Sequence, residues 1–282
     1  MDKAARNNRA NQLNPNNEKH QPNQASKDNR ANQLNPNNEK YKGGGVFCSP
    51  RSATTRNMAD AAPKYKLIYF NAPAKAEPLR WMFAYGGVPF EDFRIKERPQ
   101  IVTGKPNPEW DELKQKLPFG VVPVLEVNGE YLGEGAAIAR YLAPKCGLAG
   151  ANEWETAQAD GIVTFIENEF PFQVVREWII ATAQKNPEKA ATMQKLMQPN
   201  LMKVAERLDG ILQRKKTESG KSGFFVGKAP TIADLFAVSF FEWVEGYIKP
   251  GVLSVEFPLL VAHRELVREL PGIKEFLALH QP

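Results

Sequence analysis

Residues 117 to 143, LPFGVVPVLEVNGEYLGEGAAIARYLA, carry two groups that could hold a small peptidic ligand. Val122 precedes Pro123, and a proline cannot occupy the middle of a strand ladder. We infer a bent Val122–Pro123 peptide, with the cis form as a hypothesis, that exposes the backbone N–H and C=O of Val122. A helix then begins near Glu134, and the free N–H groups of a helix start can bind an anion. The alternative is a hairpin and a helix with no ligand.

The same stretch contains the elements that would position these groups. Val124 to Val127 is apolar and β-branched, which is typical of a strand. Asn128-Gly129 favours a hairpin, because a type I′ turn needs two positive φ angles. Residues 130 to 132 return as a second strand, and from Glu134 the apolar residues follow a helical period.

Upstream residues predict a βαβ unit. Residues 65–70 and 90–95 have strand patterns, and residues 75–85 between them form a helix that Gly86-Gly87 ends. A polar, Pro-rich loop over residues 96–109 leads to a short helix. Residues 64–145 therefore predict a small α/β domain of the thioredoxin-like type.

Beyond residue 145 the patterns are helical. Helices are expected over residues 154–184 and 188–215, from Thr231 onward, and over the short segments 259–269 and 273–279. Thr231 and Asp234 form a variant of the capping box, for which a role in folding is the simpler explanation. We expect an all-helical domain over residues 152–282.

The first 57 residues contain a repeat, NRANQLNPNNEK, at 8–19 and again at 29–40. Such a polar segment buries too little apolar surface to offset its ordering entropy, so a disordered tail is expected over residues 1–60. It lacks the apolar core of a secretory signal and the Ser-rich amphipathic pattern of a transit peptide. Met58 resembles an ordinary start, and the role of the tail stays open.

Composition excludes several classes of function. The net charge of +5 arises in residues 1–57, which hold ten Lys or Arg and four Asp or Glu, so the remainder is nearly neutral and does not favour nucleic acid. No apolar run is long enough to span a membrane. Two cysteines indicate a reducing, cytoplasmic location, and three scattered histidines offer no metal-ligand spacing, so we expect no metal.

Three motifs in order carry a family resemblance. YKLIYFNAPAKAEPLRWMFAYGGVPFEDFRI, LPFGVVPVLEVNGEYLGEGAAIARYLA and GKAPTIADLF resemble segments of sigma-class glutathione transferases, the class that includes haematopoietic prostaglandin D synthase. The resemblance covers residues 64 to 280. It implies a thioredoxin-like domain followed by a helical glutathione transferase C-terminal domain, glutathione as co-substrate, a detoxifying transferase activity and a homodimer.

The resemblance assigns Tyr69 as the catalytic residue, because a tyrosine ending the first strand of this family hydrogen-bonds to the glutathione sulfur. A neutral donor beside the thiol favours the thiolate, which is the nucleophile. Lowering a thiol pKa of about 8.5 by two units would need about 2.7 kcal/mol. The alternative is that Tyr69 is simply an aromatic residue of the strand.

The resemblance also implies the residues that hold glutathione. Trp110 and Lys114, one helical turn apart, would contact its glycyl end. The backbone of Val122 would pair with its cysteinyl residue, as in an added strand. Its γ-glutamyl end would lie at Glu134 and Gly135. The complete set implied by the resemblance is Tyr69, Lys75, Trp110, Lys114, Gly120, Val121, Val122, Pro123, Glu134 and Gly135.

Three positions depart from the family pattern. Gly135 replaces a serine and has no hydroxyl for the ligand carboxylate, a loss of about 1.5–3 kcal/mol, or roughly tenfold to hundredfold in affinity. Lys75 replaces an arginine, which keeps the charge but loses the planar fork. Val121 stands where Lys or Gln is common. The loop before Trp110 also looks longer than usual.

The electrophile pocket is expected between the domains. Phe70, Phe170, Phe172 and Trp178 are candidates for its wall, although aromatic residues at helical spacing also suit a core. Glu167 is the candidate for the acidic residue that this family lends across the dimer interface.

Three functions remain open at this level. The first is a transferase that conjugates glutathione to apolar electrophiles. The second is a catalytically weakened relative with a binding or structural role, as in lens crystallins, which Gly135, Val121 and Lys75 favour. The third is a glutathione-dependent prostaglandin D synthase.

Overall fold

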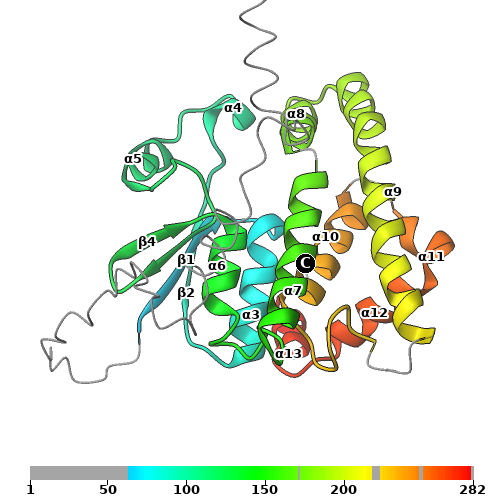
Figure 1. Cartoon of the computed structure of the whole chain (residues 1–282). Helices are drawn as coiled ribbons and strands as arrows, with labels where there is room; N and C mark the ends of the chain where they lie inside the picture. Colours follow the sequence, from blue (N-terminus) through cyan, green and yellow to red (C-terminus); the bar gives the residue numbers. More distant parts are fainter. Residues whose placement is uncertain (1–62, 171, 218–222, 248–249, 281–282) are drawn as a thin grey trace, which may run out of the picture. The chain divides into compact units, whose positions relative to one another are not determined.

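The computed structural model describes residues 63–170, 172–217, 223–247 and 250–280 (Figure 1). The expected tail over residues 1–60 lies outside the described residues. Within the described ranges, no helix combines the length and hydropathy that crossing a membrane would require.

A mixed sheet forms the first part of the described chain. Its strands are β1 (Tyr65–Phe70), β2 (Glu91–Ile95), β3 (Val124–Val127) and β4 (Glu130–Gly133), in the spatial order β2-β1-β3-β4. β1 and β2 are parallel, whereas β3 is antiparallel to both β1 and β4. The φ angles of Asn128 and Gly129 are 52° and 90°, so the predicted hairpin turn is confirmed.

Five helical segments accompany the sheet. They are η2 (Ala74–Ala76), α3 (Glu77–Gly86), α4 (Gln100–Thr103), α5 (Pro108–Lys116) and α6 (Gly135–Leu142). The helix expected from Lys75 begins as the 3-10 turn η2 and continues as α3. α4 corrects the expectation of an unstructured loop over residues 96–109. The thioredoxin-like arrangement of the prediction is confirmed.

β1 lies at the centre of two apolar clusters. Its side chains alternate between the two faces of the sheet. Leu67 and Tyr69 belong to the larger core with α3 and the C-terminal helices. Ile68 faces a smaller cluster that contains Ile95 and Trp110. Tyr69 is thereby held on the face of the sheet that the helices cover.

The second part of the chain is helical, as predicted. Its helices are α7 (Glu153–Glu169), α8 (Phe172–Ala183), α9 (Pro187–Thr217), α10 (Ile232–Tyr247), α11 (Val252–Glu256), α12 (Pro258–Arg268) and α13 (Ile273–Leu279). The single helix expected over residues 154–184 was wrong, because α7 ends before Phe170, which is extended with φ −78° and ψ 117°. A residue before proline avoids the helical region, and Pro171 follows Phe170.

Asp234 organises the start of α10. Its carboxylate accepts hydrogen bonds from the Thr231 N–H at 2.7 Å, the Thr231 hydroxyl at 3.0 Å and the Phe225 N–H at 2.9 Å. Nε2 of His263 lies 2.9 Å from the same carboxylate. All of these groups are buried. The folding role expected for Thr231 and Asp234 fits this network, since it ties α10 to the preceding turn and to α12.

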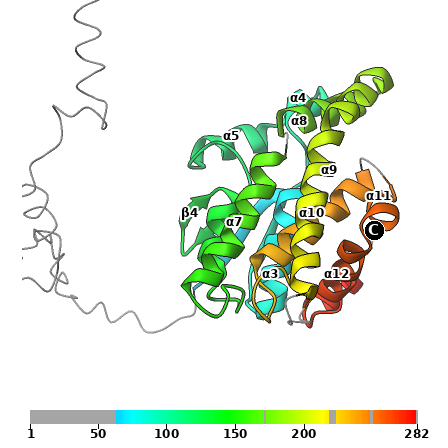
Figure 2. The same cartoon turned by 45° about the vertical axis from the view of Figure 1, so that its right-hand side comes forward.

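The two parts pack directly against each other. α10 contacts both α3 and α7, and α4 contacts α8. Figure 1 and Figure 2 both show α4 beside α8. The contact between α4 and α8 therefore closes one side of the space between the sheet and the helical part.

Candidate active site

A cavity of about 560 Å³ lies between the sheet and the helices. Its wall is built by β1, by η2 and the start of α3, by α4 and the two residues before it, by residues 121–123, by the start of α6, and by α7, α8 and α10. Among the residues predicted for the site, the cavity brings together Tyr69, Phe70, Lys75, Val121, Val122, Pro123, Glu134, Gly135, Glu167, Phe170 and Phe172.

Tyr69 of β1 lines this cavity. The residue is 9% exposed, and burial raises its pKa above the ordinary value of 10.0. The backbone N–H of Lys75 bonds to the phenol oxygen, and the guanidinium groups of Arg98 and Arg80 act on it electrostatically; all three lower the pKa. The phenol therefore keeps its proton at neutral pH and can donate it to a ligand.

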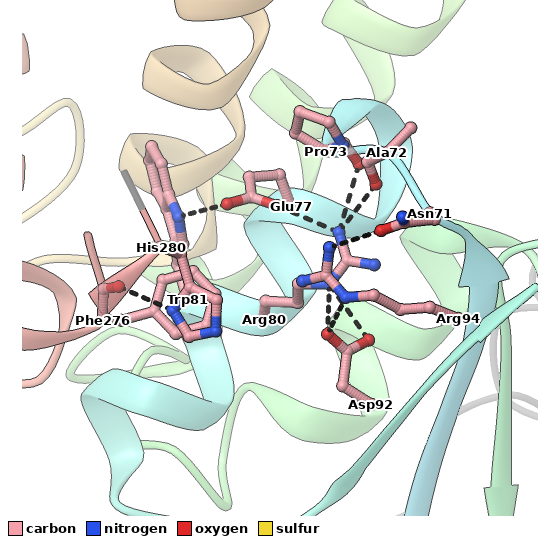
Figure 3. A network of polar contacts seen from close by, with 10 residues as sticks. All are labelled: Asn71, Ala72, Pro73, Glu77, Arg80, Trp81, Asp92, Arg94, Phe276 and His280. Carbon is pink, nitrogen blue, oxygen red and sulfur yellow. Dashed lines mark hydrogen bonds and ion pairs between the residues drawn. The ribbon is translucent and has the colours of Figure 1, made fainter. Parts of the chain in front are cut away.

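A buried arginine holds the loop that follows Tyr69 (Figure 3). Nη1 of Arg80 donates to the carbonyl oxygen of Ala72 at 2.9 Å and to Glu77 at 3.0 Å. Its Nε donates to both carboxylate oxygens of Asp92 at 3.1 Å. Arg80 is 0% exposed, and its Nη2 has no partner within the described residues. The loop that carries Lys75 is thus tied to α3 and β2.

Sequence reasoning missed Arg80. A signal was present, since Arg80 sits among the apolar residues Leu79, Met82 and Phe83 of α3, where a charge needs a partner. Asp92 also accepts from Nε of Arg94 at 2.7 Å, so one carboxylate on β2 serves two guanidinium groups.

Lys75 reaches the helical part of the chain. Its Nζ lies 3.3 Å from the centroid of the Phe172 ring, a cation–π contact. Burial lowers the pKa of Lys75, and the carboxylates of Glu167 and Glu134 oppose this. Burial raises the pKa of Glu167, with Lys75 acting in the opposite direction. Lys75, Glu134 and Glu167 form a charged group at one end of the cavity.

The start of α6 lies at the same end. A Cβ placed on Gly135 would lie 3.6 Å from Oε1 of Glu167 and 3.7 Å from Cγ of Pro123. Glu134, which caps α6, has φ 69° and ψ 118°, a strained conformation for a residue with a side chain. The free N–H groups of the first turn of α6 and two carboxylates therefore meet beside Pro123.

Val122 lies between β1 and this polar end. The Val122–Pro123 peptide is cis, as hypothesised from the sequence. Within the described residues, neither the N–H nor the C=O of Val122 has a backbone partner. A peptidic ligand can therefore pair with this residue as an added strand.

Trp110, Lys114 and Gly120 lie outside the wall of the cavity. Trp110 is buried, and its ring is tilted by 55° against that of Phe70, with 5.0 Å between the ring centroids. Lys114 is exposed, and its side chain passes within 3.4 Å of a Cβ placed on Gly120. The structure thus places these residues behind Phe70 and at the rim.

Glu167 lines the cavity of its own chain. No second chain is required to bring its carboxylate there, and its action across a dimer interface stays a prediction. Trp178 lies outside the wall and contacts Trp243, with 6.1 Å between ring centroids. Phe170 and Phe172 line the wall, with 4.6 Å between their ring centroids, and their part in an electrophile pocket stays a prediction.

The remainder of the wall was not foreseen from the sequence. It is mostly apolar, with two arginines among its members: Ala74, Pro78, Arg98, Pro99, Ile101, Val102, Ile166, Val175, Arg176, Ile179, Phe236, Ser239, Phe240 and Trp243. Several of these residues come from α4 and its flanks, the segment expected to be loop. The site therefore combines one buried phenol donor, a polar end for a peptidic ligand and an apolar space beside it.

Comparison with known proteins agrees with this arrangement. Residues 65–144 match the family model described as the N-terminal domain of glutathione S-transferase, and residues 174–280 match that of its C-terminal domain. The hematopoietic prostaglandin D synthase of Gallus gallus is 34% identical over 216 residues, which are 76% of this chain and 96% of that protein. Glutathione S-transferase 1 of Ascaris suum is 34% identical over 216 residues, with 77% and 96% covered.

A solved structure shows the same likeness. The glutathione S-transferase from Ascaris lumbricoides has a TM-score of 0.64 and 33% sequence identity, and the match covers 78% of this chain and 98% of that one. Two domain models in the expected order, and relatives matched over nearly their whole length, show that the chain belongs to the glutathione S-transferase family.

Proposed function

We propose that the protein is a sigma-class glutathione transferase in which Tyr69 activates the glutathione thiol for attack on an apolar electrophile. The observation that carries the proposal is that Tyr69 is buried and lines a cavity with both charged and apolar residues. A phenol whose pKa is raised by burial stays protonated and donates to the sulfur.

Glutathione would lie along the polar part of the cavity. Its γ-glutamyl carboxylate would face the N–H groups that begin α6, and its ammonium group would face Glu134 and Glu167. Its cysteinyl backbone would pair with Val122. Its glycyl end would extend to the rim, toward Trp110 and Lys114.

The reaction follows from this placement. The thiol releases its proton to solvent, and the Tyr69 O–H stabilises the resulting thiolate. The sulfur then attacks the electrophilic carbon, which lies among the apolar residues of α7, α8 and α10. With a chlorinated dinitrobenzene, a C–S bond forms, the C–Cl bond breaks and chloride leaves. A thiol pKa lowered by two units corresponds to about 2.7 kcal/mol of thiolate stabilisation.

The first test is the initial rate of glutathione conjugation to a chlorinated dinitrobenzene. Tyr69→Phe should reduce this rate strongly, whereas Tyr131→Phe, at an exposed position of β4, should not. A wild-type rate in Tyr69→Phe would refute the role of the phenol.

A second candidate function is a weakened transferase that serves as a binding or structural protein. Gly135 favours it, because the residue offers no hydroxyl to the ligand, as does the engagement of Lys75 with Phe172. A rate no better than buffer, from a folded protein, would support it. Prostaglandin D synthesis is a third candidate, which the likeness to the Gallus gallus hematopoietic prostaglandin D synthase supports.

We also propose a cytoplasmic homodimer with a role in detoxification. Membership of the family supports this proposal. Light scattering tests the dimer, and a monomer would refute it. The place of Glu167 in the cavity of its own chain does not depend on that result.

A further inference from the structure

We propose that the apolar part of the cavity selects electrophiles that carry a carboxylate, and that Arg98 and Arg176 bind this group. The inference rests on the proposed function and names the class of its second substrate.

The first observation is that both arginines line the cavity without an ion pair or a hydrogen bond to another described residue. Both side chains are exposed. Five other arginines of the described chain are paired with carboxylates: Arg80, Arg94, Arg140, Arg264 and Arg268. A guanidinium group is well suited to bind a carboxylate, because its N–H groups form a planar fork.

The second observation is where the two arginines come from. Arg98 lies just before α4, and Arg176 lies on α8. These two helices contact each other, so the arginines approach the cavity from neighbouring elements (Figure 1, Figure 2). An anion bound by both would link the sheet domain to the helical domain.

The third observation is the surroundings of the pair. Ile101 and Val102 of α4 and Ile179 of α8 line the same wall. Ile101 is 51% exposed and gives a ligand apolar surface to cover. The acidic residues of the cavity wall, Glu134 and Glu167, instead face Lys75. An apolar chain with an anionic end fits this distribution of charge.

The position of Arg98 also relates the anion to the reacting sulfur. Its guanidinium lowers the pKa of the Tyr69 hydroxyl electrostatically, so Arg98 lies near the group that would stabilise the thiolate. A compact electrophile can thus place its carboxylate on the arginines and its reactive carbon at the sulfur. In an α,β-unsaturated ketone, the sulfur bonds to the β-carbon, the π electrons move toward the carbonyl, and the α-carbon takes a proton from solvent. No group leaves.

The test compares ethacrynic acid, an apolar unsaturated ketone with a carboxylate, with its neutral primary amide. We expect the double variant Arg98→Gln and Arg176→Gln to lose about tenfold or more in kcat/KM for the acid. The ratio of kcat/KM for the acid to kcat/KM for the amide should therefore fall about tenfold or more, because any effect of Arg98 on Tyr69 acts on both substrates alike. Arg207→Gln, at an exposed position of α9 outside the cavity, is the matched control. Arg98→Lys with Arg176→Lys should recover part of the loss.

Three outcomes would overturn the proposal. Equal losses for acid and amide would indicate a structural role. A raised KM for glutathione with an unchanged KM for the acid would assign the arginines to glutathione. Equal kcat/KM for the acid in the double variant and in wild type would show that the two arginines do not bind its carboxylate. Salt gives an independent check, because KM for the acid, but not for the amide, should rise with ionic strength.

Binding separates this inference from the proposed function. The saturated analogue of ethacrynic acid cannot react, so its affinity can be measured by calorimetry without turnover. Preference for the acid over its amide, lost in the double variant, would support the carboxylate site even if no conjugation occurs. Absence of that preference in wild type would overturn the carboxylate site even if conjugation is robust.

Discussion

Restoring a hydroxyl at Gly135 tests the proposed glutathione site most directly. Gly135 begins α6, and a Cβ placed there meets Oε1 of Glu167 at 3.6 Å and Cγ of Pro123 at 3.7 Å. Both are ordinary van der Waals distances, and the φ angle of Gly135 is not in the left-handed region. A serine therefore fits without displacing its neighbours.

The expected gain follows from the hydrogen bond that serine adds. A bond from a neutral hydroxyl to a charged carboxylate contributes about 1.5–3 kcal/mol. Gly135→Ser should therefore lower the Kd for glutathione by about tenfold or more. Gly135→Ala is the matched control, because it adds the same Cβ without the hydroxyl. Both variants lose the backbone freedom of glycine, and alanine should raise the free energy of unfolding by about 0.4–1 kcal/mol.

Calorimetric titration of glutathione into the three proteins measures the effect, and urea unfolding monitors stability. If serine and alanine bind glutathione equally, the ligand carboxylate does not lie at the start of α6. A weaker affinity of both variants than of wild type would mean that the Cβ itself obstructs the ligand.

Three further predictions concern buried groups. Arg80→Met should cost about 1–3 kcal/mol of unfolding free energy by urea titration, because the Ala72 carbonyl and Glu77 lose a buried donor, whereas Asp92 keeps its ion pair with Arg94. The conjugation rate should fall with it, and an unchanged stability would contradict the network. The pKa of Tyr69 is raised in the folded state, so its contribution to stability is present below pH 10 and lost as pH rises through the folded-state value. Between pH 9 and pH 11, the free energy of unfolding should therefore fall more in wild type than in Tyr69→Phe. Equal decreases in the two proteins would contradict the burial of the phenol. Burial raises the pKa of the Cys146 thiol to about 11, so little reactive thiolate is present at pH 8. In a Cys48→Ser background, a thiol reagent at pH 8 should therefore label Cys146 after unfolding and not before. Rapid labelling of the folded protein would refute this prediction.

Much of the fold could be predicted because its signals are local. The Asn128-Gly129 turn, the apolar strand before it and the helical period after it each depend on residues close in sequence. The break between α7 and α8 was missed although it is also local. The helical pattern continues on both sides of Phe170, so the break depends on the conformational restriction that the following proline alone imposes.

The candidate site was predicted in part. Tyr69, Val122 and Glu134 could be named because the motifs of the family mark them, and the cavity contains all three. The place of Trp110 could not be foreseen, since its burial behind Phe70 depends on how α5 folds over the sheet.

The sequence by itself determined the order of the elements, the hairpin and the two-domain organisation, because turn chemistry and apolar periodicity act over a few residues. Tertiary structure alone decided which charges meet. Arg80 binds Asp92 and the carbonyl of Ala72, and Lys75 contacts the ring of Phe172. Each of these contacts joins segments that are brought together only by packing. Likewise, Arg98 and Arg176 line one cavity because α4 packs on α8, and no pattern within either segment specifies that contact.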